Sequence, residues 1–310
     1  RFSKRSEEVL CTSRCGIFHC LWTIFYRLLG IFACKHSNYL CSIALCSLTL
    51  TSCGDGDDAN DSHGGGGGYT SKRILSVHTD YTENQEDKYF TYDNLGRVVE
   101  MIKNYKDYKG SSIRSTTTKY TYSDTRITKE VTGYDNYTDY YYLSNGRIVR
   151  EERTGAHIIP TVIVYTYDKN GYVSSRTLNS KTDYNNEIKT INYTWVNGYM
   201  MEENMTSKTT NTHGDVTTDF GKAIYTYTKI PWLKGMFSYY EEDYWDPVLR
   251  GMGYYGNLPK CLPATNSRDN GTPYIAETYK HSLSGENVGT LEVYWEERTY
   301  PSVTYTFTWQ

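Results

Sequence analysis

Residues 165–171 read Tyr165-Thr166-Tyr167-Asp168-Lys169-Asn170-Gly171, and this stretch decides the fold. Two aromatic residues flank a threonine, and a turn sequence that ends in Asn-Gly follows at once. Successive side chains of a β-strand point to opposite faces, so the two aromatics share one face and the threonine takes the other. Asn and Gly accept the positive φ angles of a tight hairpin turn. The stretch therefore predicts a strand, a hairpin turn and a returning antiparallel strand.

The same unit recurs along the chain after residue 69. Further aromatic-Thr-aromatic triplets are Phe90-Thr91-Tyr92, Tyr120-Thr121-Tyr122, Tyr193-Thr194-Trp195 and Tyr225-Thr226-Tyr227, and Tyr140-Tyr141-Tyr142 takes the place of one of them. Turn sequences of matching chemistry are Asp93-Asn94-Leu95-Gly96, Ser144-Asn145-Gly146 and Asn197-Gly198. The triplets begin 20 to 32 residues apart, which fits two strands and two connections in each repeat.

Residue usage in these repeats determines the expected fold class. Tyr, Thr, Val and Ile dominate, and no long segment has the 3.6-residue period of an amphipathic helix. We therefore predict an all-β protein in which about 12 to 16 strands form an antiparallel meander, either a closed barrel or a large curved sheet. Neither face of residues 112–119 is apolar, whereas a membrane-spanning barrel needs one apolar face on each strand. The pattern favours a soluble sheet.

The segment before the repeats has the features of an export signal. Residues 39–50 are an apolar run of signal-peptide length, preceded by Lys35 and His36. The run ends in Leu50-Thr51-Ser52-Cys53, which resembles the lipobox of bacterial lipoproteins. The resemblance implies cleavage before Cys53 and lipidation of its sulfur, and two or three acyl chains would hold the protein firmly on a membrane.

These features divide the chain into four parts. Residues 1–34 are interpreted as an upstream segment of doubtful origin, residues 35–52 as the signal peptide, residues 53–68 as an acidic and Gly-rich tether, and residues 69–310 as the Tyr-rich β domain. Cys261 is the only cysteine after Cys53, and we expect it to be a buried structural thiol.

Charge excludes one class of partner. Residues 53–310 carry 27 basic and 34 acidic side chains, so the mature part has no positive footprint for a phosphate backbone. We expect no nucleic-acid partner. The sequence also shows no metal-ligand spacing, phosphate-binding loop or nucleophile motif, and we expect no cofactor, no metal and no enzymatic activity.

The segment between Trp232 and Lys260 departs from the repeat and is rich in rings. The candidate ligand-binding residues in it are Trp232, Tyr239, Tyr240, Tyr244, Trp245, Tyr254 and Tyr255. Flat rings interrupted by Pro and Gly suit a carbohydrate-stacking surface. The alternative is that these rings fill the end of the sheet core.

Carboxylates beside the same rings leave a catalytic alternative open. They are Glu241, Glu242, Asp243 and Asp246 near Trp245, with Glu296 and Glu297 near Trp295. Paired carboxylates are the machinery of a glycoside hydrolase. Acids adjacent in one strand point to opposite faces, so solvated strand edges explain them equally well.

The triplet-turn unit resembles the YD repeats of large bacterial shell proteins, as in Tyr92-Asp93-Asn94-Leu95-Gly96-Arg97-Val98. Together with the lipobox and with residues 254–260, it looks more like a family of Bacteroidetes lipoproteins of unknown function whose domain has a porin-like fold. The resemblance covers residues 70–310 and carries no catalytic residues. It implies an outer-membrane lipoprotein, with the cell surface as the preferred location and the periplasmic face as the alternative. The expected role is non-catalytic, either binding of a glycan or envelope protein or a purely structural one.

Overall fold

The computed structural model describes residues 73–107, 113–134, 136–155, 159–232, 236, 245–269, 273–296 and 298–310. The chain divides into two compact units, Arg1–Ser52 and Cys53–Gln310, and all described residues belong to the second. The predicted signal peptide, the tether and Cys53 therefore lie outside the described residues.

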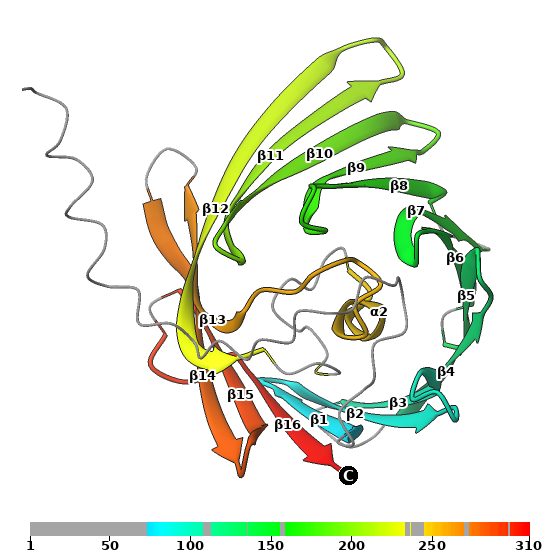
Figure 1. Ribbon diagram of the computed structural model, residues 1–310. Helices are drawn as coiled ribbons and strands as arrows, with labels where there is room; N and C mark the ends of the chain where they lie inside the picture. The colour runs from blue at the N-terminus through cyan, green and yellow to red at the C-terminus, as the bar shows by residue number, and fades with distance from the viewer. Residues whose placement is uncertain are drawn as a thin grey trace, which may run out of the picture. The chain divides into compact units, whose positions relative to one another are not determined.

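Sixteen strands in the described part of the chain form one closed barrel (Figure 1). They are β1 (Ile74–Tyr81), β2 (Asn84–Tyr92), β3 (Val98–Asp107), β4 (Ile113–Tyr122), β5 (Arg126–Gly133), β6 (Tyr137–Ser144), β7 (Arg147–Thr154), β8 (Thr161–Tyr167), β9 (Val173–Lys181), β10 (Asn185–Val196), β11 (Tyr199–Asn211), β12 (Val216–Pro231), β13 (Cys261–Asp269), β14 (Pro273–Ser284), β15 (Asn287–Trp295) and β16 (Val303–Trp309). Each strand pairs antiparallel with its neighbours in sequence, and β1 pairs with β16. The predicted antiparallel meander is confirmed, and its edges meet instead of remaining open.

In such a meander every second connection lies at the same end of the barrel. The turns that join β2 to β3, β6 to β7, β8 to β9 and β10 to β11 therefore gather at one end, which we call the glycine-turn end. Their positive-φ residues are Gly96, Asn145, Gly146, Gly171, Asn197 and Gly198. The hairpin turns predicted from Asn and Gly are thus present. The long connection from β12 to β13 leaves the wall at this end too.

The aromatic triplets place their side chains as the period of two predicts. The first rings point into the barrel and are buried, as at Tyr120, Tyr165 and Tyr193, whereas the central threonines are exposed. The second aromatic donates a hydrogen bond to a backbone carbonyl at the start of the preceding strand. These bonds are Tyr92 to Ile74 (2.7 Å), Tyr122 to Val98 (2.7 Å), Tyr167 to Ile148 (2.5 Å), Trp195 to Val173 (2.8 Å), Tyr227 to Met200 (2.7 Å) and Trp309 to Val288 (2.8 Å).

These bonds have a common structural role. At the glycine-turn end, a turn connects the two strands of every second neighbouring pair. Each of these hydrogen bonds from an aromatic side chain joins two neighbouring strands that no turn connects at this end. A tryptophan can replace tyrosine at two of the sites because its indole N–H is also a donor.

One repeat was predicted in the wrong register. The triplet pattern predicts that Tyr140 and Tyr142 of β6 point into the barrel. Instead, the inward-facing side chains are Tyr141, which is 1% exposed, and Leu143. An irregularity between Tyr142 and Leu143 shifts the pairing of β6 with β7. Leucine has no hydroxyl, and here the backbone N–H of Leu143 donates to Thr125 at 2.8 Å instead.

Cys261 opens β13 and is fully buried, as expected. Its sulfur lies 3.6 Å from the Tyr199 hydroxyl. It is disulfide-bonded, so the expectation of an unpaired thiol is wrong. Every other cysteine of the chain lies outside the described residues.

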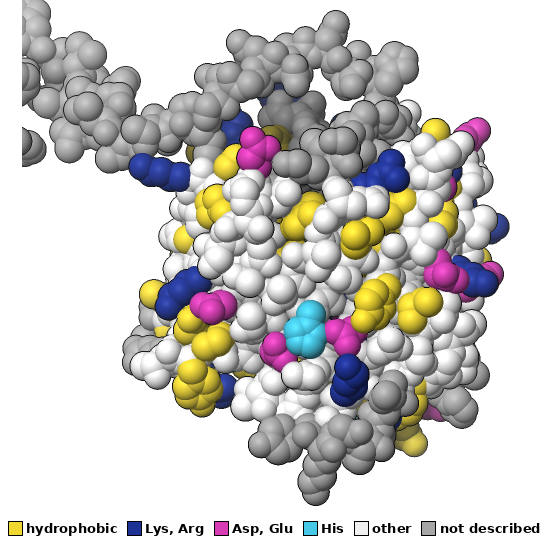
Figure 2. Space-filling view, turned by 90° about the horizontal axis from the view of Figure 1, so that it is seen from below, with side chains coloured by type: hydrophobic (Ala, Val, Ile, Leu, Met, Phe, Trp, Pro, Cys, Tyr) yellow, Lys and Arg dark blue, Asp and Glu magenta, His cyan; other side chains and the backbone are white. Residues whose placement is uncertain are grey.

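The outer wall of the barrel is polar. His78 on β1 pairs with Asp87 on β2 at 2.6 Å, and Lys222 on β12 lies 2.9 Å from Glu202 on β11. Figure 2 shows charged side chains of both signs on one face of this wall, with hydrophobic side chains in small separate groups. Among the described residues, no helix is both long and apolar enough to cross a membrane.

We predict that Gly171→Val will destabilise the barrel by about 1–3 kcal/mol, because a β-branched residue is strained at positive φ. Gly171 has a φ of +83°, and the close neighbour of an added Cβ is the end of the flexible Arg147 side chain, which can move aside. Gly221→Val is the matched control, since Gly221 lies in β12 without a positive φ and an added Cβ there also meets the end of a flexible side chain, that of Met205. Denaturant unfolding should show a clearly smaller loss for the control. Equal losses would mean that the positive φ at the turn has no energetic cost.

Candidate functional site

The connection from β12 to β13 folds back into the barrel and forms a plug. We use this name for the described residues Trp232, Met236 and 245–260. Figure 1 shows its helix α2 (Pro247–Gly251) inside the ring of strands. Asp246 caps this helix by accepting a hydrogen bond from the Leu249 N–H at 3.0 Å, and a proline follows at the first helical position, both favourable at a helix start.

Backbone hydrogen bonds fasten the plug to the glycine-turn end. The N–H of Asn257 donates to the Gly171 carbonyl at 3.0 Å, and the N–H of Lys260 donates to the Gly198 carbonyl at 3.0 Å. The wall also donates to the plug, from Ile148 N–H to the Tyr254 carbonyl at 2.8 Å. The turns that reverse the strands therefore also hold the segment that enters the lumen.

The plug contains the predicted ligand-binding rings that the structure describes. Trp245, Tyr254 and Tyr255 are buried, with exposed fractions of 7%, 6% and 3%, and Trp232 is half-buried. Tyr239, Tyr240 and Tyr244 lie outside the described residues. The burial of the three rings favours the alternative in which they fill the end of the core, because a stacking platform needs an exposed face.

The environment of Trp245 shows how completely its ring is enclosed. The guanidinium groups of Arg250 and Arg176 lie 4.4 and 5.1 Å from its ring. The rings of Tyr165 and Tyr255 lie 5.5 and 4.9 Å away, the latter edge-on. Aromatic and cation contacts of this kind stabilise the fold beyond the area that they bury.

A cluster of charged side chains joins the plug to the wall, and we call it the interior cluster. It consists of Lys129, Asp139, Glu151, Arg153 and Asp246. Lys129 Nζ lies 3.0 Å from Asp246 Oδ2 on the plug and 3.5 Å from Asp139 Oδ2 on β6. Arg153 Nε lies 2.7 Å from Asp139 Oδ1.

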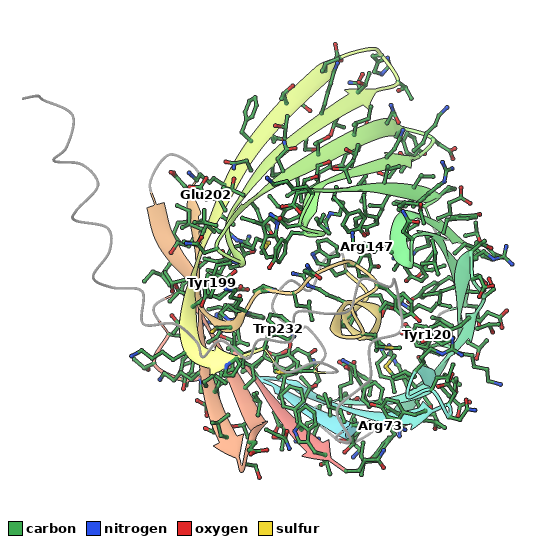
Figure 3. All side chains as sticks on the ribbon, viewed as in Figure 1. Arg73, Tyr120, Arg147, Tyr199, Glu202 and Trp232 are labelled. Atoms are coloured by element: carbon green, nitrogen blue, oxygen red, sulfur yellow. The ribbon has the colours of Figure 1, made fainter. Side chains whose placement is uncertain are left out.

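Tyrosine hydroxyls extend the interior cluster. Tyr120 donates to Asp246 Oδ2 at 3.1 Å, and Figure 3 shows its side chain directed from β4 towards α2. Tyr165 donates to Glu151 at 3.1 Å, and the Tyr255 hydroxyl lies 3.5 Å from the same carboxyl group. Buried charges are tolerated only when paired and hydrogen-bonded in this way.

The surroundings of Glu151 disfavour its negative charge. Burial, together with the nearby negative charge of Asp139, raises its pKa to about 7, although Arg153 and Lys129 act in the opposite direction. A carboxyl group whose folded-state pKa exceeds its unfolded value of about 4.3 favours folding less as it ionises. The stability that the protonated Glu151 carboxyl contributes to the folded state is therefore lost as the pH rises from about 4 to 7.

We predict that Glu151→Gln will make the protein more stable than wild type at pH 8, by about 1–3 kcal/mol, because glutamine fills the site without a buried charge. The difference should disappear below about pH 4, where the wild-type carboxyl is protonated in both states. Melting temperatures of both proteins across this range are the measurement. A pH-independent difference would contradict the raised pKa of Glu151.

The carboxylates considered for glycoside hydrolysis do not form a pair in the described part of the chain. Asp246 is occupied by the helix cap and by Lys129. Glu296 is exposed and adjoins the end of β15 on the wall. Glu241, Glu242, Asp243 and Glu297 lie outside the described residues. No group of three or more His, Cys, Asp or Glu in the described ranges is placed to hold a metal ion.

A second site lies on the outer wall, and sequence reasoning missed it. We call it the β14–β15 groove, and its volume is about 710 Å³. Its lining residues are Tyr274, Ile275, Thr278, Lys280, Tyr294, Glu296 and Arg298. Strand pairing brings these residues together, for example Thr278 opposite Tyr294. The weak sequence signal is the run of charged residues after Trp295, which the sequence pattern favours only as a catalytic candidate.

Comparison with known proteins supports the fold. The sequence matches no protein-family model and no curated protein. The structure is similar to crystal structures of porin-like proteins from Bacteroides uniformis and Bacteroides vulgatus, with TM-scores of 0.56 and 0.52. Both are 15% identical to this chain, and each alignment covers 76% of this chain and 98% of the other. At this identity the likeness confirms an all-β, porin-like fold, and the lipoprotein family and YD repeat stay predictions.

Proposed function

We propose that this protein is a lipid-anchored, non-catalytic binding barrel of the bacterial cell envelope that conducts nothing through its lumen. The observation that carries the proposal is the plug, because a channel needs an open path between the two barrel ends. In this chain α2 and its flanking rings are packed into the lumen, and Lys129 and Asp246 bind plug to wall at 3.0 Å.

The outer wall supports a location outside the hydrocarbon layer. Membrane barrels present an apolar band about 25 Å tall, flanked by aromatic girdles. Here charged side chains occur within the strands on the outer face, including Glu202, Lys222 and Asp87. Attachment through acyl chains on Cys53 accounts for an envelope location without requiring the wall to contact lipid. The similar porin-like proteins come from Bacteroides, which is consistent with display on a cell envelope.

The anchor is tested by Cys53→Ala. We expect this variant to lose palmitate labelling and membrane association, because Cys53 follows the only lipobox-like sequence that we identify. Cys46→Ala is the control, since Cys46 lies within the apolar run of the signal peptide. Equal labelling of Cys53→Ala and wild type would contradict the lipid anchor.

The closed lumen is tested by conductance. The full chain, added to planar bilayers under conditions in which a porin opens, should give no channels. The Cys53→Ala chain should also stay monodisperse without detergent. Stable channels, or a need for detergent in the unanchored variant, would mean that the wall contacts lipid and that the barrel is a pore.

A further inference from the structure

We propose that the β14–β15 groove binds a neutral carbohydrate chain. The inference rests on the proposed role as a binding barrel and gives that role a site and a ligand class. The groove volume of about 710 Å³ lies within the range of small-molecule sites, roughly 300–1,000 Å³.

The groove offers apolar ring surface to solvent. Tyr274 and Ile275 in its lining are 43% and 50% exposed. Arg298 in the lining lies 5.9 Å from the rings of Trp295 and Tyr300, which are 41% and 56% exposed. An exposed ring and an exposed aliphatic side chain that line one groove offer a ligand an apolar surface. Sugars bind through their C–H faces, which pack on rings of this kind.

The polar groups of the groove include hydrogen-bond donors and hydrogen-bond acceptors, so they can bind hydroxyl groups in either role. Lys280 and Arg298 are donors, Glu296 is an acceptor, and Thr278 is both. Tyr294 donates to Glu292 at 2.8 Å, which fixes its ring beside the groove. Sugar hydroxyls donate and accept, so a set with both functions suits them.

Charge balance selects a neutral ligand. Two cations, Lys280 and Arg298, stand against two carboxylates, Glu296 in the lining and Glu292 beside it. A polyanion gains little attraction from such a balanced set. A cationic ligand also fits poorly, because the protein's own cations already lie over the rings, with Lys280 Nζ 4.1 Å from the centre of Tyr294.

Backbone geometry at the groove is unusual. Glu296 has a φ of +55°, a left-handed conformation that costs energy for a residue with a side chain. Its N–H donates to the Ala276 carbonyl on β14 at 2.7 Å, which holds this conformation and places Glu296 in the groove lining. Such strain is found where a side chain must be held in one position for binding.

The test is calorimetric titration of the detergent-solubilised full chain with linear neutral hexasaccharides of glucose, mannose and xylose. A hexasaccharide of galacturonate serves as the acidic comparison. We expect binding of at least one neutral probe and weaker binding of the acidic one. Tyr274→Ala should weaken binding by about tenfold or more, because it removes an exposed ring at little cost to the core.

Tyr184→Ala is the matched control. Tyr184 is 76% exposed and precedes β10, far along the wall from β14 in the strand order, so its removal should leave affinity unchanged. Absence of heat with every neutral probe, tighter binding of the acidic probe, or wild-type affinity in a folded Tyr274→Ala would each overturn the proposal. None of these results would change the labelling and conductance tests, so the two proposals can fail separately.

Discussion

Trp245→Ala is expected to lower the free energy of unfolding by about 3–5 kcal/mol, the usual cost of removing a large buried ring from a core. The ring is 7% exposed and is surrounded by Tyr165, Tyr255, Arg176 and Arg250. A cavity of only about 10 Å³ adjoins it, close to the room for one water molecule, so the packing around the ring is dense. Removal of the indole would leave a void that these neighbours cannot close without losing their own contacts.

Denaturant unfolding of the Trp245→Ala protein measures this loss. Phe220→Ala is the control, because Phe220 is an aromatic residue of β12 that is 73% exposed, and its loss should hardly change stability. Trp245→Phe should recover part of the lost stability, since a smaller ring still fills much of the site. A Trp245→Ala protein as stable as wild type would show that the indole is not packed in the core.

Lys129→Met is expected to cost a similar amount, about 3–5 kcal/mol, because it leaves the buried carboxylate of Asp246 without its counter-charge, whereas Asp139 keeps Arg153. Burial alone would lower the pKa of Lys129, but Asp246, Tyr137 and Asp139 outweigh it and raise the pKa above its ordinary value. The side chain of Asp246 is 2% exposed, so water does not replace the lost ammonium group. The contact between the plug and the wall would then contain an unpaired buried charge on Asp246.

A double variant separates charge from packing at this site. Lys129→Met combined with Asp246→Asn should regain much of the stability, since asparagine is uncharged and still caps α2. Lys222→Met is the surface control, because the pair of Lys222 and Glu202 is only half-buried on the outer wall and should contribute little. A Lys129→Met protein that melts at the wild-type temperature would contradict the buried ion pair.

The repeat was predictable from the sequence because its signals are local. Alternation within Tyr165-Thr166-Tyr167 determines which side chains share a face, and the positive φ of Gly171 follows from the turn chemistry of Asn-Gly. The same reasoning failed at Tyr140-Tyr141-Tyr142, where three adjacent tyrosines give no alternation to fix the register. There a pairing irregularity between β6 and β7 decided which rings point inward.

The candidate sites depended on contacts between residues distant in sequence. A run of rings with Pro and Gly fits an exposed platform and a buried plug equally well, because aromatic rings serve in both. The buried position of Trp245 follows from Tyr165 and Arg176 on the wall, which lie far from it in the sequence. The β14–β15 groove likewise exists only because strand pairing brings Lys280 and Tyr294 together.

By itself, the sequence determined the strands, the turns and the face that the rings of the aromatic-Thr-aromatic triplets take, because these depend on neighbours two to four residues away. The tertiary structure alone decided three features: closure through β1 and β16, entry of residues 245–260 into the lumen, and the pairing of Lys129 with Asp246. Each of these joins residues far apart in the chain. Their free energy comes from burial and from paired charge in a dry interior, which exist only after the whole wall has formed around the plug.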